Sequence, residues 1–419
     1  METADNMNAE TTRHSVSDLT SSETEVLVER FSRSGEGIAG RHRIQGALPG
    51  EVWRLSKTPK LVRAVPDRVD APCPVFQTCG GCSLQHASDS FVADWKAQLI
   101  AAALRAHGLE TEIRTTQTSP PRSRRRAGIA GRRTKKGVKL GFHARRTHEI
   151  VALEECHVLE PQITGALPLL QRMTRIAAPR AREIRLQVTS GPAGLDIDLR
   201  DTKPLDAALR GALAELATEG RVARLCVDGE MLFQAHPPHQ VMGSARVVPP
   251  PGGFLQATAA GEGALVSAVL EIVSEAKPVV DLFAGCGTFA LRLAERASVL
   301  AVEADRQALA ALDAAWRGTA GLRPVRCARR DLFRRPLLAD ELAPFDAVVL
   351  DPPRAGAQAQ TAELAKSRVD SIAYVSCDPV TFARDAAQLV SAGFRLNWIQ
   401  PVDQFLWSDH VELAAAFSR

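Results

Sequence analysis

The chain has 419 residues, of which 45% are hydrophobic and 24% charged, and its formal net charge is +4. This composition is ordinary for a globular protein and is large enough for two or three domains. No apolar run approaches the ~20 residues of a membrane-spanning helix, and no hydrophobic leader precedes the first domain, so we expect a cytoplasmic protein with no membrane partner. Residues 1–21 are polar and predict a disordered tail.

Residues 22–70 alternate short apolar runs with glycine-rich turns, as in VLVERFSRSGEGIAG. This pattern predicts a small antiparallel β-barrel. The stretch resembles a TRAM domain, a small RNA-binding barrel of the oligonucleotide-binding type. Basic residues that would suit contacts with an RNA backbone are Arg30, Arg33, Arg41, Arg43 and Arg63.

A group of cysteines opens the next segment, residues 71–250. Cys73, Cys79 and Cys82 have the spacing C-x5-C-x2-C, and Cys156 is the natural candidate for a fourth ligand. Eight cysteines in a chain without a leader segment indicate metal binding or catalysis rather than disulfides. Four thiolates suit a 4Fe-4S cluster or a structural zinc ion, and three clustered ligands with one distant one favour iron–sulfur.

The same segment contains a helix-like stretch at 91–108 and then a window of basic residues. Its members are Arg122, Arg124, Arg125, Arg126, Arg132, Arg133, Lys135, Lys136, Lys139, Arg145 and Arg146, with Glu149 the first acid after them. Such a window is typical of a surface that binds a phosphate backbone, although a solvated basic face is the alternative. Residues 71–250 therefore predict a central α+β RNA-binding domain, and the prolines and glycines at 249–253 mark its end.

Residues 251–419 change to a regular alternation of apolar strands and Ala- and Leu-rich helices. Strands are expected at 278–283, 298–302, 345–350 and 371–376. This α/β alternation predicts a doubly wound parallel sheet of the Rossmann-like type. The last two apolar runs, 394–399 and 410–417, leave no room for a helix between them, so we expect them to pair antiparallel.

A glycine-rich turn follows the first of these strands in VVDLFAGCGT, and Glu303 ends the second strand. The turn with that acid resembles the S-adenosylmethionine site of class I methyltransferases; a nucleotide site of another α/β protein is the alternative. The resemblance implies a set of cofactor-binding residues. They are Gln256, Phe283, Gly285, Thr288, Glu303, Asp331 and Asp351. Arg354 follows the paired prolines of DPPRAG where amino-methylating enzymes carry an aromatic residue, which counts against nitrogen methylation.

Four motifs in order, DLFAGCG, VLDPPRAG, YVSCDP and HVELAAAFSR, resemble the RNA uracil-5-methyltransferase family over most of the chain. The resemblance implies that the Cys377 thiolate adds to carbon 6 of a uracil and that Glu412 later removes the proton at carbon 5. It also places Phe254 and Gln256 in the pocket that holds the extruded base. From the residues alone, the favoured interpretation of Cys377 is a small buried residue, and that of Glu412 is a surface carboxylate that opens the last strand.

Three positions depart from the family pattern. Thr288 and Thr258 stand where the family usually has Asn, and Ser123 replaces an aromatic residue before the RRRA run. A barrel combined with a cysteine cluster resembles the branch of the family that acts on 23S ribosomal RNA. We therefore expect a monomer that methylates ribosomal RNA, with transfer RNA as the second choice of substrate and a non-catalytic RNA-binding assembly factor as the alternative function.

Overall fold

The computed structural model describes residues 24–419, and the tail expected at residues 1–21 lies outside the described residues. The chain divides into two compact units. The first contains residues 24–32 and 36–66 of the described chain, and the second contains residues 33–35 and 67–419. The second unit carries every cysteine and every residue expected to bind the methyl donor.

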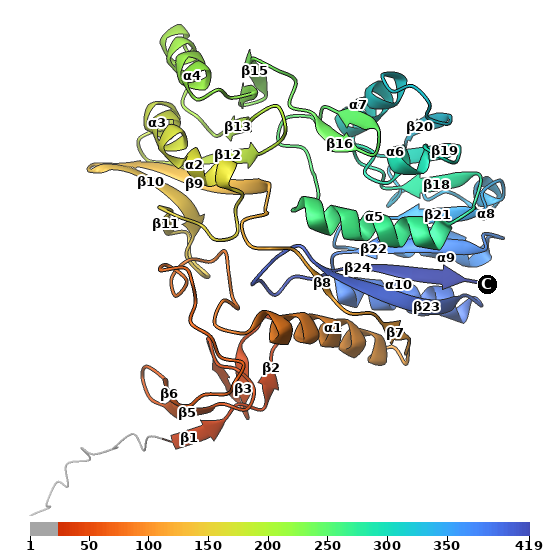
Figure 1. Ribbon diagram of the computed structural model, residues 1–419, viewed down its shortest axis with the longest axis horizontal. Helices are drawn as coiled ribbons and strands as arrows, with labels where there is room; N and C mark the ends of the chain where they lie inside the picture. Colours follow the sequence, from red (N-terminus) through yellow and green to blue (C-terminus); the bar gives the residue numbers. More distant parts are fainter. Residues whose placement is uncertain (1–23) are drawn as a thin grey trace, which may run out of the picture. The chain divides into compact units, whose positions relative to one another are not determined.

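The first unit consists of two small antiparallel sheets (Figure 1). One contains β1 (Thr24–Leu27), β5 (Val52–Leu55) and β6 (Lys60–Arg63), and the other β2 (Arg30–Phe31), β3 (Gly37–Ala39) and β4 (His42–Ile44). Val28, Ala39, Ile44 and Ala47 form its core. Its buried Glu51 accepts hydrogen bonds from the Leu48 amide at 2.8 Å and the Trp53 indole at 2.9 Å. These sheets agree with a small β-domain, and the TRAM identification stays a prediction.

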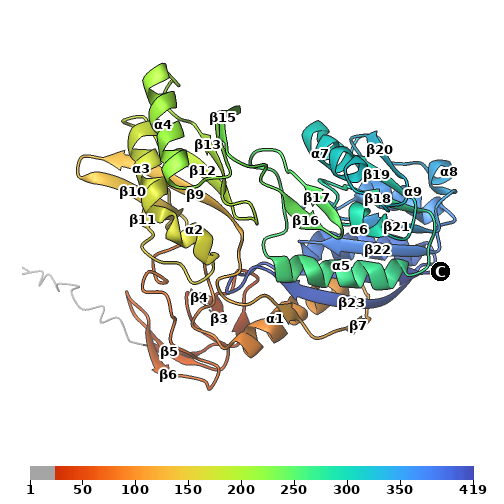
Figure 2. The ribbon, with the colours of Figure 1, turned by 45° about the horizontal axis from the view of Figure 1, so that its top comes forward.

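The first half of the second unit is built on a seven-stranded sheet. Its strands, in spatial order, are β11 (Ile150–Ala152), β10 (Gly137–His143), β9 (Arg126–Thr134), β12 (Ile184–Thr189), β13 (Asp196–Arg200), β14 (Arg224–Val227) and β15 (Glu230–Gln234). The helices here are α2 (Pro161–Gly165), α3 (Leu167–Ala177) and α4 (Ala207–Glu219). Figure 2 shows α3 and α4 side by side against this sheet, where their leucines share one core with its strands.

A nine-stranded sheet forms the other half of the unit. Its strands, in spatial order, are β20 (Val325–Arg329), β19 (Val299–Glu303), β18 (Val279–Leu282), β21 (Ala347–Leu350), β22 (Ser371–Ser376), β24 (Glu412–Ser418), β23 (Arg395–Asp403) and β7 (Glu112–Ile113), with β8 (Gln117–Thr118) also pairing with β23. β18 to β22 are parallel, and β24 is antiparallel to both of its neighbours. A hairpin of β16 (Gln240–Met242) and β17 (Ala245–Val247) precedes this half.

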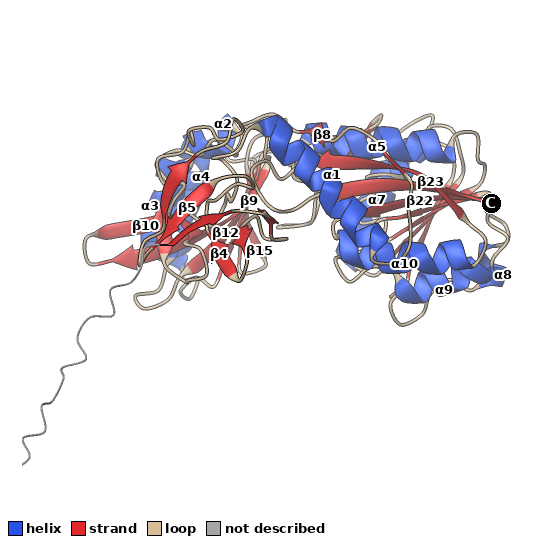
Figure 3. Ribbon diagram, turned by 90° about the horizontal axis from the view of Figure 1, so that it is seen from below, coloured by secondary structure: helices blue, strands red, loops and turns tan. Residues whose placement is uncertain are grey.

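Helices cover both faces of the nine-stranded sheet (Figure 3). One face packs against α5 (Ala259–Val273), α6 (Ala290–Leu293) and α7 (Arg306–Arg317). The other packs against α1 (Asp89–Arg105), α8 (Ala339–Leu342), α9 (Gln358–Lys366) and α10 (Pro379–Ser391). Two-sided cover explains why the parallel strands are continuous apolar runs in the sequence. None of the helices in residues 24–419 combines the length and apolar character needed to cross a bilayer.

The expected parallel strands and the antiparallel pairing of the last two strands are confirmed. The sequence did not predict that α1, β7 and β8, from residues expected to form the central domain, join this sheet and its helical cover. β7 and β8 have two residues each, too few for a periodic pattern to reveal them. They pair with β23, whose outer edge would otherwise be open.

Candidate active site and cysteine cavity

All nine residues expected to bind the donor or perform the chemistry line one cavity of about 590 Å³. They are Gln256, Phe283, Gly285, Thr288, Glu303, Asp331, Asp351, Cys377 and Glu412. Six of them lie at or just after the carboxyl ends of the parallel strands β18 to β22. Ligands of open α/β sheets bind at this edge, and the structure therefore brings the predicted set together at the expected place.

The turn after β18 is held in an unusual backbone conformation. Phe283 has a φ of +64° and Gly287 a φ of +97°. A Cβ atom on Gly287 would lie 2.9 Å from a Leu312 side-chain carbon, so both the conformation and the space require glycine. The Glu303 carboxylate accepts the Gly285 N–H at 3.0 Å and thereby ties the end of β19 to this turn.

Aromatic rings stand beside the same turn and at the pocket's entrance. Phe283 lies against Phe333, with ring centroids 5.5 Å apart. Phe333 also lines the cavity and was not predicted from the sequence. Phe254, which is 65% exposed, lies below the Arg126 guanidinium, whose central carbon is 5.7 Å from the ring centroid. Exposed rings at a cavity mouth suit the stacking of a planar base or an adenine.

Buried carboxyl groups gather beneath the cavity. Burial, followed by the nearby Glu303 carboxylate, raises the pKa of Asp351 to about 7. The Gln256 amide donates to Asp351 at 3.4 Å. Asp281, inside β18, was not predicted as a site residue, yet burial and then Asp351 raise its pKa well above the ordinary value. The only signal for it was a lone acid in an apolar strand, VVDL.

Cys377 occupies the short connection between β22 and α10. The next residue, Asp378, caps α10 by accepting the Val380 and Thr381 amides at 2.9 Å and 3.4 Å, so strand and helix fix Cys377 from both sides. Its side chain is partly buried and faces the cavity. Burial raises the pKa of the Cys377 thiol to about 12, with Glu412 and then Asp351 adding to the shift. The thiol is therefore neutral in the ligand-free protein.

Glu412 begins β24 and is only 4% exposed, so the reading of Glu412 as a surface carboxylate is wrong. Burial raises the pKa of its carboxyl to about 8, and Asp351 contributes in the same direction. β24 lies beside β22, with Leu413 opposite Ser376, and this pairing places Glu412 close to Cys377. A thiol and a carboxyl group of elevated pKa therefore share one desolvated site, an arrangement that suits general-base chemistry near neutral pH.

Two of the positions that depart from the family pattern have structural contacts. Thr258 caps α5 by accepting the Gly261 amide at 2.9 Å, and its hydroxyl lies 2.7 Å from that of Ser119. Thr258 therefore anchors the helix rather than lining the cavity. The Ser123 hydroxyl donates to the Pro120 carbonyl at 2.6 Å and stabilises a turn.

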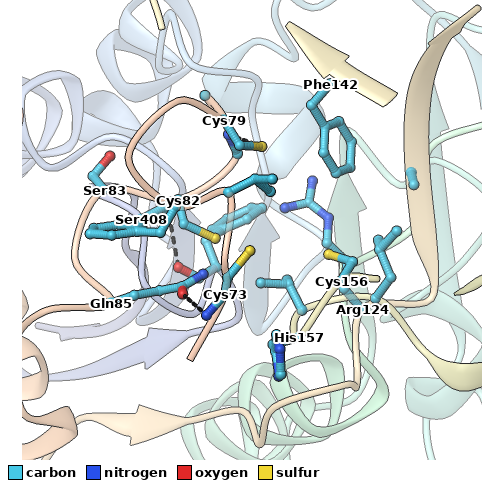
Figure 4. A pocket seen from close by; sticks show the side chains of 18 of the residues that line it. Cys73, Cys79, Cys82, Ser83, Gln85, Arg124, Phe142, Cys156, His157 and Ser408 are labelled. Carbon is cyan, nitrogen blue, oxygen red and sulfur yellow. Dashed lines mark hydrogen bonds between the residues drawn. The ribbon is translucent and has the colours of Figure 1, made fainter. Parts of the chain in front are cut away.

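A second cavity, of about 390 Å³, is lined by all four of the predicted cysteine ligands (Figure 4). Burial raises the pKa of Cys79, Cys82 and Cys156, and the charges of neighbouring thiolates raise these pKa values further. Each of the four cysteines is close enough to the other three for such an electrostatic effect. Within residues 24–419, no group of three or more His, Cys, Asp and Glu side chains is arranged to hold a single metal ion. Four sulfurs around one zinc ion would have to lie ~3.8 Å apart, because ~2.3 Å bonds in a tetrahedron set that spacing.

Several residues of the basic window have structural roles, and for its exposed members the phosphate-binding surface stays a prediction. The Arg145 side chain donates to the carbonyls of Phe76, Cys79 and Cys82 and so holds the cysteine loop. Arg125 is buried and pairs with Glu262. The exposed members Arg132, Arg133, Lys135, Lys136 and Lys139 lie on the β9–β10 hairpin.

The cysteine loop contacts the loop that precedes β24. The amides of Ser83 and Leu84 donate to the Trp407 carbonyl at 2.7 Å and 2.9 Å. Arg354, Phe405 and His410 line both cavities, and the Arg354 guanidinium lies 3.2 Å from His410 Nε2. The two cavities therefore share a wall. His157, beside Cys156, lines the cysteine cavity as well.

Residues 248–419 match the family described as tRNA (uracil-5-)-methyltransferase. Over 412 residues the chain is 42% identical to an uncharacterized RNA methyltransferase of Brucella suis, an alignment that spans 96% of this chain and 99% of the relative. It is 34% identical over 426 residues to the 23S rRNA (uracil(1939)-C(5))-methyltransferase RlmD of Pseudomonas fluorescens, spanning 94% of this chain and 93% of that protein.

The fold is similar to that of the tRNA (uracil-54, C5)-methyltransferase of Pyrococcus abyssi, whose crystal structure contains S-adenosyl-L-homocysteine. The TM-score is 0.76 at 22% sequence identity, and the match covers 94% of this chain and 99% of the other. The likeness therefore extends over both halves of the second unit and is not confined to the nine-stranded sheet.

Proposed function

Because this chain belongs to the RNA (uracil-5-)-methyltransferase family and is an S-adenosylmethionine-dependent enzyme, we propose that it methylates carbon 5 of a uridine in 23S ribosomal RNA. Support for this substrate comes from a relative that acts on 23S rRNA and matches nearly the whole chain. The structural likeness to an enzyme acting on transfer RNA makes tRNA the second candidate. Either RNA is found in the cytoplasm, which remains the expected location.

The observation that carries the mechanism is the shared cavity of Cys377 and Glu412. Carbon 5 of uracil is too weak a nucleophile to take a methyl group directly. Addition of the Cys377 thiolate to carbon 6 forms a carbon–sulfur bond and opens the double bond between carbons 5 and 6, which gives an enolate whose carbon 5 is nucleophilic. S-adenosylmethionine supplies an electrophilic methyl group when bound. Glu412 then takes the proton from carbon 5, and the electron pair of that C–H bond expels the thiolate.

The other residues of the cavity support this proposal by their positions. Phe283, Gly285, Thr288, Glu303 and Asp331 surround the turn at which class I enzymes hold the methyl donor. The buried carboxyls of Asp351 and Glu412 favour a cationic ligand over a neutral one. A positive charge beside them would also lower the pKa of the Cys377 thiol and so favour its reactive form.

The proposed substrate can be tested with purified protein, methyl-labelled S-adenosylmethionine, and separated 23S rRNA and tRNA from a strain that lacks the gene. We expect the label in 23S rRNA, recovered as 5-methyluridine after digestion. Label in tRNA alone would favour the second candidate. No label in either RNA would favour an assembly factor.

The pH dependence of methyl transfer should report the ionisation of Glu412. A base acts only when deprotonated, and with a pKa of about 8 the ionised fraction falls roughly tenfold for each pH unit below that value. Because proton removal follows methyl transfer, this ionisation limits turnover, and we therefore expect kcat to rise about tenfold from pH 6 to 7 and to level off above pH 8. Initial rates on a 23S rRNA fragment measure this, with circular dichroism confirming that the protein stays folded. A flat profile between pH 6 and 9 would contradict the assignment.

We also propose that Cys73, Cys79, Cys82 and Cys156 hold a 4Fe-4S cluster, with a structural zinc ion as the alternative. All four line one cavity, and their donor set fits either group. Three clustered cysteines with one distant one favour the iron–sulfur cluster over zinc. The proposed reaction needs no electron transfer, so the role we assign to the cluster is to brace the loop that contacts Trp407.

Replacing Cys82 by serine should remove this group. In anaerobically purified protein we expect iron to fall from about four atoms per chain to nearly none, with loss of visible absorption and a lower melting temperature. Cys327→Ala is the matched control, because Cys327 lies on β20 outside both cavities. Metal analysis that found zinc and no iron in the unmodified protein would select the alternative.

A further inference from the structure

A buried glutamine outside the active-site cavity joins two of the residues that line it. Gln404 follows β23 directly and is 1% exposed. It belongs to no recognised motif of the sequence, and its side chain is not part of the cavity wall. Its contacts nevertheless reach Gln256 on one side and Glu412 on the other. Any role of Gln404 in methylation rests on the proposed function, because both neighbours take part in it.

The orientation of the Gln404 amide is fixed by the backbone. The Ala257 N–H, which can only donate, lies 2.7 Å from Gln404 Oε1 and identifies that atom as the oxygen. Gln404 Nε2 must therefore point the other way, where it donates to Gln256 Oε1 at 2.6 Å. Gln256 Nε2 then faces Asp351 Oδ2 at 3.4 Å. The Ala257 N–H thus fixes the orientation of the Gln404 amide, which in turn fixes the orientation of the Gln256 amide.

We propose that Gln404 is a positioning residue for uridine methylation, which turns the donor group of Gln256 toward Asp351 and the cavity and holds the Glu412 carboxylate in place. An amide nitrogen carries two hydrogens: one is donated to Gln256, and we assign the other to the Glu412 carboxylate. A donor at this place favours the ionised carboxylate and opposes the rise in the pKa of Glu412 that burial causes. Gln404 therefore acts on both the binding pocket and the base without touching the substrate.

The surrounding structure packs closely on Gln404. A Cβ atom on Gly261 would lie 2.5 Å from Gln404 Cβ, so the first turn of α5 packs directly on the side chain. An apolar residue of similar size would leave the Ala257 amide and the Gln256 oxygen unpaired in a buried place. The terminal torsion of Gln256 is broad and twofold, so its amide could then turn over and set oxygen against the Asp351 carboxyl.

The experiment compares Gln404→Met and Gln404→Glu with the unmodified protein. Both changes keep the approximate size of the side chain and remove its donor. Gln400→Met is the matched control, because Gln400 is another buried glutamine on β23 whose amide donates only to backbone carbonyls, those of Thr115 and Pro401. Two quantities are measured: the titration of the Glu412 carboxyl carbon by carbon-13 NMR without RNA, assigned with Glu412→Gln, and the pH profile of methyl transfer.

We expect both Gln404 variants to raise the pKa of Glu412 and to shift the acid limb of kcat to higher pH, with about a tenfold loss near pH 7. The shift should be larger for Gln404→Glu, which adds a carboxyl where a donor stood. Gln400→Met should reproduce any loss of stability and leave both profiles unchanged. If Gln404→Met does not fold, Gln404→Glu, which can still accept the Ala257 amide, serves for both measurements.

An unchanged Glu412 titration together with an unchanged acid limb in the Gln404 variants would overturn the inference. The NMR titration needs neither RNA nor turnover, so it judges the contact between Gln404 and Glu412 by itself. If the unmodified protein transferred no methyl group to RNA while the titration shifted as expected, the proposed function would fail and the positioning contact would stand.

Discussion

Replacing Cys377 by alanine is expected to lower methyl transfer to RNA by at least ~10⁴-fold, as removal of an attacking nucleophile does in other covalent enzymes. The residue follows β22 in a fixed connection and faces the cavity, and no other cysteine side chain in residues 24–419 lies there except Cys286. Burial raises the pKa of the Cys286 thiol to about 12, and the proposed mechanism gives it no part. Labelled S-adenosylmethionine with 23S rRNA measures the loss.

Calorimetry should show that Cys377→Ala still binds S-adenosylmethionine, which separates lost chemistry from lost folding. Cys327→Ala provides the control, since Cys327 lies away from the cavity on β20. The unmodified enzyme and this control should both form a transient protein–RNA bond. Product formation by Cys377→Ala at an undiminished rate would mean that methylation does not pass through this sulfur.

The second large effect is expected for Glu412→Gln, which should accumulate the protein–RNA adduct instead of merely slowing the reaction. Carbon–sulfur bond formation and methyl transfer precede proton removal, so loss of the base blocks only release. Removing the Glu412 carboxylate also lowers the pKa of Cys377, because Glu412 contributes to its elevation, and this eases the first step. We expect turnover to fall about 10²- to 10⁴-fold.

The adduct can be detected as a complex that survives denaturing electrophoresis and carries both labelled RNA and the labelled methyl group. Glu230→Gln is a suitable control: the exposed Glu230 pairs with Arg210, and neither residue is part of the cavity wall. Release of methylated RNA by Glu412→Gln at the normal rate would exclude this carboxylate as the base. A complex without the methyl label would mean that the substitution stops an earlier step.

The nine cavity residues could be predicted because each belongs to a local pattern or a motif. In a parallel sheet, every strand ends at the same edge, so Phe283, Glu303, Asp351 and Cys377 meet in space although they are distant in sequence. Gln404 could not be found this way. Its role depends on the Ala257 amide, which only the folded loop brings within 2.7 Å.

Charge in the sequence was a weaker guide than spacing. The basic window contains Arg125 and Arg145, whose side chains are used inside the protein, and composition does not distinguish these from the exposed basic residues of the β9–β10 hairpin. The four cysteines that were selected by their spacing, in contrast, line one cavity. Cys156 is distant from the other three cysteines in sequence. The segment 156–159 lines the same cavity, and a β-bridge between Arg124 and Leu159 holds this segment in place.

The position of β24 between β22 and β23 has a consequence during synthesis of the chain on the ribosome. Cys377, which follows β22, is synthesised about 35 residues before Glu412, which begins β24. Until residues 412–418 emerge, β22 has an exposed edge and its carboxyl end lacks lateral support. A chain that lacks residues 412–418 therefore lacks both the strand that pairs with β22 and the carboxyl group proposed as the base.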